Sequence, residues 1–100
     1  MKKHGNLNEN DAEHHLYEIF DLELDDTYKF GICGDPLNQD GTSPRANLQV
    51  KEFNRAFGWQ RFVPRVLLTG IAGRMEAKRI ENECIEAYRQ KHGRKPRGND

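Results

Sequence analysis

The chain has 100 residues, with 16 basic and 16 acidic side chains and two cysteines. A chain of this length forms one domain with one modest core. No apolar run approaches the ~18 residues that a membrane-spanning helix needs, so we expect no contact with a membrane. Two cysteines are too few for a disulfide framework, and we expect both to be reduced.

The net charge of zero conceals a division along the chain. Residues 1–44 carry ten Asp or Glu against three Lys, whereas residues 45–100 carry thirteen Lys or Arg against six Asp or Glu. Such asymmetry is typical of a basic face that binds an anion, often a nucleic acid. It is equally consistent with an acidic half that folds against the basic half and neutralises it. Charge alone leaves both interpretations open.

The first half of the chain predicts a flexible arm followed by a β-hairpin. Residues 1–13 are polar and rich in Asn, as in an unstructured arm. Residues 14–24 alternate with apolar side chains on both faces, which indicates a strand covered on both sides. A turn signal at 25–26 leads to a second strand over 27–33. Alternation assigns Tyr28 to one face of this strand, opposite the face of Lys29, although a bulge at Gly31 could change this.

A loop and a helix come next. Residues 34–44 are rich in Gly, Pro, Asn and Asp, which is typical of a loop. Ser43 can cap a helix whose apolar spacing extends over 45–57. Gly58 then ends the helix.

The last part of the chain predicts a third strand and a long helix. Residues 61–69 are rich in Val, Leu and Phe, and Pro64 within them predicts an edge strand or a bulge. A turn at 70–73 precedes a helix over 74–92, which stops at Gly93. The order β-β-α-β-α predicts an α+β fold, a small three-stranded and mainly antiparallel sheet flanked by helices. Residues 14–100 form this single domain.

One side chain of the long helix is unusual for a core. Its apolar face contains Ala77, Ile80, Glu81, Cys84, Ile85 and Tyr88 at spacings of three and four. A buried unpaired carboxylate is costly, so Glu81 needs a cation, a proton or a water-filled cleft. An ordinary ion pair with Arg45, Arg74 or Lys78 is the alternative.

Three further side chains are candidates for chemistry. Tyr17 shares a strand face with His15, which could carry a proton. Lys29 lies beside Gly31, whose missing side chain leaves space. Arg45 falls in the first turn of a helix, where a phosphate could meet its guanidinium and free backbone amides. For each, a solvated surface residue is the ordinary interpretation, and position alone leaves it open.

The order of these candidates resembles the GIY-YIG nuclease superfamily, in particular the small C-terminal toxin domains of bacterial polymorphic toxins. The matching segments are HLYEI at 15–19 with Tyr17, KFG at 29–31, Arg45, A-x-x-x-E at 77–81, and GRKPRGN at 93–99 with its closing Asn99.

The resemblance implies a hydrolytic phosphodiesterase that uses one divalent cation, Mg²⁺ or Mn²⁺. It implies that Glu81 binds the metal, which polarises a phosphate oxygen. Tyr17 would take a proton from the attacking water, with His15 or Lys29 lowering its pKa. Arg45 would neutralise charge on the phosphate, and Asn99 would orient groups around the site.

Basic residues of the long helix and tail would hold a nucleic-acid backbone without reading its sequence. These residues are Arg74, Lys78, Arg79, Arg94, Lys95 and Arg97. The resemblance further implies a domain secreted as part of a larger toxin. It would act in the cytoplasm of a target cell, prefer DNA to RNA, and be neutralised by an immunity protein.

Two other functions stay open. Lys29 stands where the family often has Tyr, and His15-Leu16 replace Gly-Ile before Tyr17. These departures motivate a non-catalytic nucleic-acid-binding domain with a decayed site. The third possibility is a repair or restriction-type GIY-YIG nuclease that is not a toxin.

Overall fold

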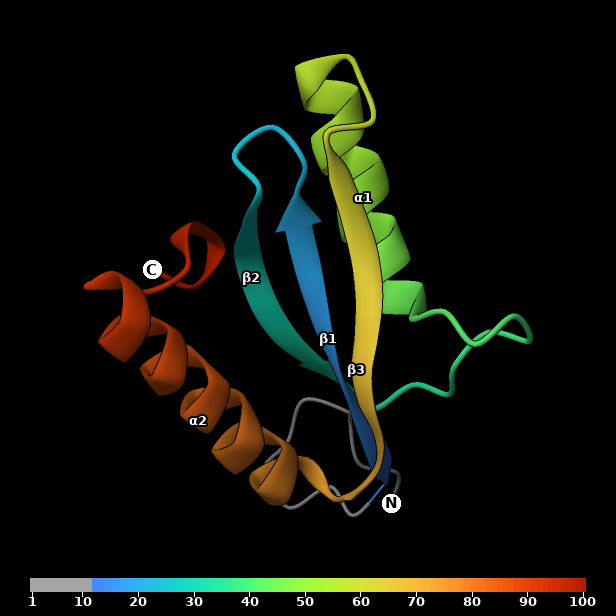
Figure 1. Cartoon of the computed structure of the whole chain (residues 1–100). Helices are drawn as coiled ribbons and strands as arrows, with labels where there is room; N and C mark the ends of the chain where they lie inside the picture. The colour runs from blue at the N-terminus through green and yellow to red at the C-terminus, as the bar shows by residue number, and fades with distance from the viewer. Residues whose placement is uncertain (1–11) are drawn as a thin grey trace.

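The computed structural model describes residues 12–100, which form an α+β fold (Figure 1). The elements are β1 (Glu13–Asp21), β2 (Asp26–Cys33), α1 (Pro44–Phe57), β3 (Phe62–Ala72), α2 (Arg74–His92) and the short 3₁₀ helix η1 (Arg97–Asn99). The predicted order β-β-α-β-α is confirmed. Most of the expected arm, residues 1–11, lies outside the described residues, and Glu13 begins β1.

The three strands form one antiparallel sheet in the order β2-β1-β3. Strand β1 is central, and its alternate side chains enter two separate cores. Tyr17 and Ile19 pack with Ala46 and other residues on the α1 side. Leu16 packs with Ala77 on the α2 side. The two helices therefore cover opposite faces of the sheet, and the predicted strand with two buried faces is confirmed. The strand ends at Asp21, and residues 22–24, which were expected to continue it, form a turn.

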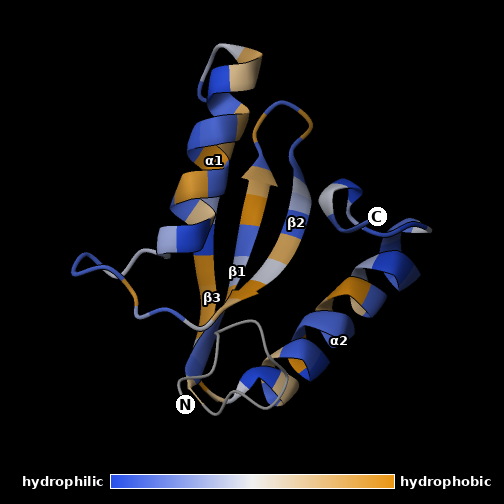
Figure 2. Cartoon of the chain, turned by 180° about the vertical axis from the view of Figure 1, so that it is seen from behind, coloured by the Kyte–Doolittle hydropathy of each residue, from blue (hydrophilic) through white to orange (hydrophobic). Residues whose placement is uncertain are grey.

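Both helices begin and end near the predicted residues. The Ser43 side chain caps α1 by accepting the backbone N–H of Ala46, and Gly58 ends the helix in the left-handed conformation. Gly93 ends α2 in the same way. Figure 2 shows mostly hydrophilic residues on both helices, with hydrophobic ones confined to part of each. None of the helices in residues 12–100 is long and apolar enough to cross a membrane.

The predicted face of Tyr28 is wrong. Ile19 pairs with Lys29 and Phe20 with Thr27, so Tyr28 is an extra residue in a β-bulge. The bulge turns its ring to the α1 side, where the ring centroid lies 5.4 Å from that of Phe53. A bulge reverses the alternation that the sequence pattern assumes, which is why the prediction failed.

The end of the third strand also differs from its prediction. Strand β3 continues through Gly70 to Ala72, across most of the predicted turn at 70–73. Gly70 has a left-handed conformation. The strand continues past it because the pairing with β1 is irregular between His14 and Leu16. Pro64 lies in β3 at the edge of the sheet, as predicted. Cys33 and Cys84 are not joined by a disulfide in the structure.

Candidate active site

Tyr17 lies at the centre of the domain, directly opposite Gly31 in the β1–β2 pair. Its side chain is buried, and it packs against the backbone of residue 31. A Cβ atom there would come within 2.7 Å of Tyr17 Cε1 and closer still to Cζ and Oη. The glycine therefore provides the space that the tyrosine ring occupies.

The Tyr17 hydroxyl donates a hydrogen bond to Gln49 Oε1 on α1, at 3.2 Å. Burial raises the pKa of Tyr17 to about 12, although the nearby Arg45 lowers it. The phenol is therefore neutral at physiological pH. A flipped Gln49 amide could donate to a phenolate, so this partner suits both protonation states.

Arg45 adds positive charge beside Tyr17, and Lys29 lies near Arg45 and Glu81. Arg45 lies in the first turn of α1 and donates from Nη1 to the carbonyl oxygen of Ile32 at 3.1 Å, on strand β2. Burial is the main cause that lowers the pKa of Lys29. The negative charge of Glu81 raises this pKa, and the positive charge of Arg45 lowers it. Lys29 is thus within electrostatic reach of both. Tyr28 packs against the core on the α1 side instead.

Glu81 is a largely buried carboxylate at the edge of a polar cavity. Its side chain is 14% exposed, and Lys78 Nζ lies 3.9 Å from Oε1. Burial raises the pKa of Glu81, while Lys78, Lys29 and Arg74 lower it. The cavity measures about 460 Å³ and is also lined by Asn82, Lys95 and Asn99, among others. Glu81 thus does form the ion pair with Lys78 that was the alternative explanation, but the contact is long. The carboxylate also lines the cavity.

Asn99 is ordered by its contacts with β2. Its side-chain amide accepts a hydrogen bond from the Phe30 N–H and donates one to the Phe30 carbonyl, both at 2.8 Å. These two bonds imitate a neighbouring strand and cover part of the β2 edge. Asn99 thereby lines the Glu81 cavity while its amide is occupied by backbone.

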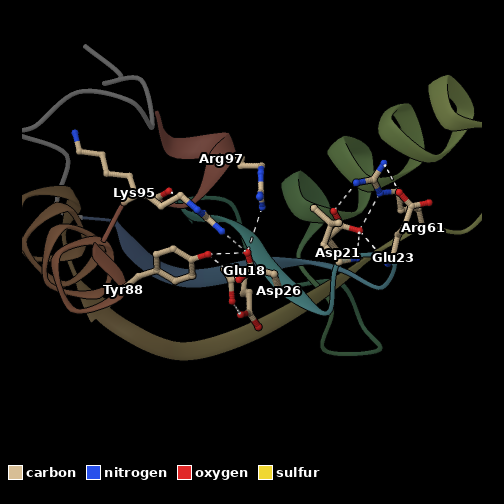
Figure 3. Close-up of polar contacts among 11 residues, drawn as sticks. Glu18, Asp21, Glu23, Asp26, Arg61, Tyr88, Lys95 and Arg97 are labelled. Atoms are coloured by element: carbon tan, nitrogen blue, oxygen red, sulfur yellow. Dashed lines mark hydrogen bonds and ion pairs between the residues drawn. The ribbon is translucent and has the colours of Figure 1, made fainter. Parts of the chain in front are cut away.

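Asp26, at the start of β2, holds the tail in place (Figure 3). It accepts hydrogen bonds from Tyr88 Oη at 2.7 Å, Arg94 Nη2 at 2.9 Å and Arg97 Nη1 at 3.3 Å. Burial raises the pKa of Asp26, but the bonds from Tyr88 and Arg94 keep it below its usual range. Sequence reasoning missed this residue because it resembled an ordinary turn aspartate.

His15 binds a helix cap rather than Tyr17. Its Nε2 lies 2.7 Å from Ser43 Oγ, and its ring centroid lies 6.4 Å from that of Tyr17. Burial and the neighbouring charges of His14 and Arg45 lower the pKa of His15. The geometry thus joins His15 to the start of α1.

The predicted nucleic-acid-binding residues divide into two groups. Arg79 pairs with Glu76 and Glu83 on the exposed side of α2, and Arg94 and Arg97 pair with Asp26. The other group lies near Glu81: Arg74, Lys78 and Lys95. The second group is therefore the better placed to meet a phosphate at the site.

Gln49 is a site residue that sequence reasoning missed. It stands four residues after Arg45, so both lie on the same flank of α1. The four-residue spacing from Arg45 is the feature of the sequence that could have identified Gln49. Within residues 12–100, no three His, Cys, Asp or Glu side chains lie close enough together to hold a metal ion. The side-chain oxygens at the polar cavity that could bind a metal are those of Glu81, Glu86 and Asn82.

A family model described as URI fold toxin 2 matches residues 7–93. No curated protein and no solved structure matches the chain.

Proposed function

The chain belongs to the URI fold toxin 2 family, and we propose that it is a nuclease that hydrolyses phosphodiester bonds with the help of a divalent cation. Members of this family are toxin domains of polymorphic toxins. Their URI fold is GIY-YIG-like. We propose the nuclease activity, the metal and the role of each residue in addition to this family membership.

One observation carries the proposal: four side chains from four separate elements share one electrostatic environment. The charges of Arg45 and Glu81 shift the pKa of both Tyr17 and Lys29. A hydrolytic phosphodiesterase needs a positive clamp, a group that handles the proton of water, and an anionic ligand for a cation. This cluster offers one candidate for each.

In this proposal Arg45 and Lys29 bind the scissile phosphate and Tyr17 accepts the proton of the attacking water. Burial disfavours the Tyr17 phenolate and Arg45 favours it, so we expect the cleavage rate to rise with pH above neutrality. Gln49 fixes the orientation of the hydroxyl. Asn99 fixes the tail beside the cavity, and His15 acts indirectly by holding the start of α1.

The donor set suits Mg²⁺ or Mn²⁺. Two carboxylates line the polar cavity: Glu81 is largely buried, and Glu86 pairs with Arg89. The amide of Asn82 lies at the same cavity. Mg²⁺ keeps most of its waters and often takes only one or two carboxylates. Once bound by Glu81, the ion would supply Lewis-acid stabilisation of charge on the phosphate and leaving oxygen. Protonation of Glu81 opposes metal binding, and its raised pKa moves this loss toward neutral pH.

The family implies an immunity protein as partner and delivery to target cells. We propose that the domain is secreted as part of a larger toxin and acts in the cytoplasm of the recipient. We propose DNA rather than RNA as the preferred substrate.

Digestion of plasmid DNA and of RNA tests the activity, with Mg²⁺ or with EDTA. The wild type should cut with Mg²⁺ alone, and Glu81→Ala should lose at least about a hundredfold in rate, as for loss of a key electrostatic group. Glu83→Ala is the matched control, because Glu83 lies on the same helix and pairs with Arg79. Equal activity of Glu81→Ala and wild type would refute the metal assignment.

A wild type that cuts neither substrate would instead favour the non-catalytic binding domain. Growth arrest on expression in bacteria, relieved by Glu81→Ala and not by Glu83→Ala, separates a toxin from a repair or restriction-type nuclease.

A further inference from the structure

A second surface feature lies away from the Glu81 cavity. A groove of about 510 Å³ runs between α1 and the edge strand β3, with Lys51, Arg55, Trp59 and Pro64 among its lining residues. We call it the Trp59 groove. Trp59 is the sole tryptophan of the chain, and it is 47% exposed. Exposure of so large an aromatic ring in a groove is typical of a binding site.

The loop that carries Trp59 is held rigidly. The Asn54 side chain accepts the Phe62 N–H at 2.8 Å and donates to the Phe62 carbonyl at 3.1 Å and to Gln60 at 3.2 Å. The Arg61 guanidinium lies 4.5 Å from the Phe57 ring centroid, and Asp21 binds it through two hydrogen bonds. The backbone that carries Trp59 is therefore anchored by its neighbours, which lowers the entropic cost of ordering this loop when a ligand binds.

The groove has unneutralised positive charge. Lys51 and Arg55 are four residues apart on α1, so they project from the same side of the helix. Neither makes an ion pair with another residue in the described part of the chain, whereas Arg79 and Arg89 of α2 each pair with a glutamate. Glu52, the nearest carboxylate in sequence, does not line the groove.

The groove and the candidate active site lie on different flanks of α1. Gln49 bonds to Tyr17 of β1, while Asn54 bonds to Phe62 of β3. A helix is about 10 Å across, so a ligand strand that reaches both sites has to pass over α1. The Trp59 groove is therefore a separate contact.

We propose that the Trp59 groove binds single-stranded nucleic acid. A base stacks on Trp59, and the adjacent phosphates contact Lys51 and Arg55. Stacking with flanking cations is the usual arrangement of sites for unpaired strands, since bases within a duplex are already stacked. Pro64 opposes the other obvious use of this edge, strand addition by a partner protein, because it lacks a backbone N–H. The choice of a polyanionic ligand rests on the proposed nuclease function.

Fluorescence of Trp59 reports the contact directly, because the chain has no other tryptophan. The full chain in EDTA, which prevents cleavage, is titrated with oligo(dT), oligo(U) and a blunt DNA duplex. We expect saturable quenching by one or both single strands at concentrations where the duplex quenches little. The relative affinity of the two single strands shows whether the groove prefers DNA or RNA.

Variants then test the individual contacts by anisotropy of a labelled oligonucleotide. Lys51→Ala with Arg55→Ala should weaken binding about tenfold and flatten the slope of log K against log salt by about 1.4, as for two lost phosphate contacts on a single strand. Lys51→Arg with Arg55→Lys, which keeps the charge, should bind as the wild type does. Trp59→Ala should bind at least about fivefold more weakly, and Trp59→Phe should retain most of the affinity.

Unchanged binding in both the Trp59→Ala and the double alanine variants, with folding verified by circular dichroism, would overturn the proposal. So would quenching by poly-glutamate without quenching by any oligonucleotide, which would assign the groove to an acidic protein partner. Binding in EDTA does not depend on cleavage. A protein that binds but never cuts would refute the nuclease function and leave this inference standing.

Discussion

The ring of Tyr17 occupies the space that a side chain at Gly31 would need. A Cβ at residue 31 would lie 2.7 Å from Tyr17 Cε1, with Tyr17 Cζ and the hydroxyl oxygen closer still. We therefore expect Gly31→Ala to displace the ring, to lower the free energy of unfolding by about 1–3 kcal/mol, and to reduce cleavage. Urea unfolding and the plasmid assay measure the two effects.

A double-mutant cycle identifies the cause of this loss. In a Tyr17→Ala background the ring is absent, so Gly31→Ala should cost much less than it does in the wild type. Equal costs in both backgrounds would show that the backbone of residue 31, and not the tyrosine ring, requires glycine.

Titration of Tyr17 predicts a loss of stability at alkaline pH. Its folded pKa of about 12 lies above the ordinary value of 10. Below pH 10 both states keep the proton; between pH 10 and 12 the unfolded chain releases it and the native state retains it. Stability should therefore fall by roughly 2–3 kcal/mol over this interval. Tyr17→Phe should remove this component, measured as the difference between the two proteins at each pH. A constant difference would contradict the raised pKa.

Sequence pattern was sufficient for the elements of the fold, and it proposed most of the residues of the candidate site. Alternation over 14–24 predicted β1 because both of its faces are buried, and capping residues such as Ser43 marked the ends of α1. Glu81 was identified because a carboxylate on an apolar stripe has few ordinary explanations. Such features are local, so the sequence contains them directly.

The features that sequence reasoning missed depend on tertiary contacts. The bulge lies at Tyr28 and arises from pairing with β1, whereas the residue type within 27–33 that indicates a bulge is Gly31. Arg94 and Arg97 resembled ligands for phosphate, but a partner 68 or more residues away engages them. Gln49 acquires its role only once Tyr17 faces α1. Charge partners and hydrogen-bond partners of this kind follow from the fold and not from spacing.

The contact of His15 with Ser43 predicts a cost for losing either partner. Ser43 caps α1 through Ala46 N at 3.2 Å and also lies 2.7 Å from His15 Nε2, in a buried position. Ser43→Ala should lower the free energy of unfolding by about 2–4 kcal/mol, from the lost cap and the unsatisfied imidazole. Chemical denaturation near neutral pH gives the value. In a His15→Leu background, Ser43→Ala should cost only the roughly 1 kcal/mol that the lost helix cap accounts for. If the cost is the same as in the wild type, the contact between His15 and Ser43 does not contribute to stability.

The same contact sets a pH dependence in acid. Burial lowers the pKa of His15 below the ordinary 6.5, so the unfolded chain binds the proton first as pH falls. The contribution of neutral His15 to stability is thus complete above about pH 6.5 and is lost as pH falls through the folded pKa. His15→Leu should be less sensitive to pH between about 7 and 5. A wild type and variant with parallel profiles would show that another group causes the acid loss.

Asn99 predicts a local effect on β2 that can be separated from global stability. Its amide makes the hydrogen bonds to both Phe30 N–H and Phe30 carbonyl, and Asp26 fixes the residues before it. Asn99→Ala should speed hydrogen exchange at the Phe30 amide and lower stability by about 1–2 kcal/mol, the usual value of two such bonds. Asp26→Asn weakens the pairing with Arg94 and should produce a smaller increase at the same amide. Asn82→Ala changes the same cavity without touching β2, so it should leave the Phe30 amide protected. If exchange at Phe30 is the same in Asn99→Ala and Asn82→Ala, the tail does not cover this edge in solution. Any loss of cleavage in Asn99→Ala would then have to come from a direct contact of the amide with substrate.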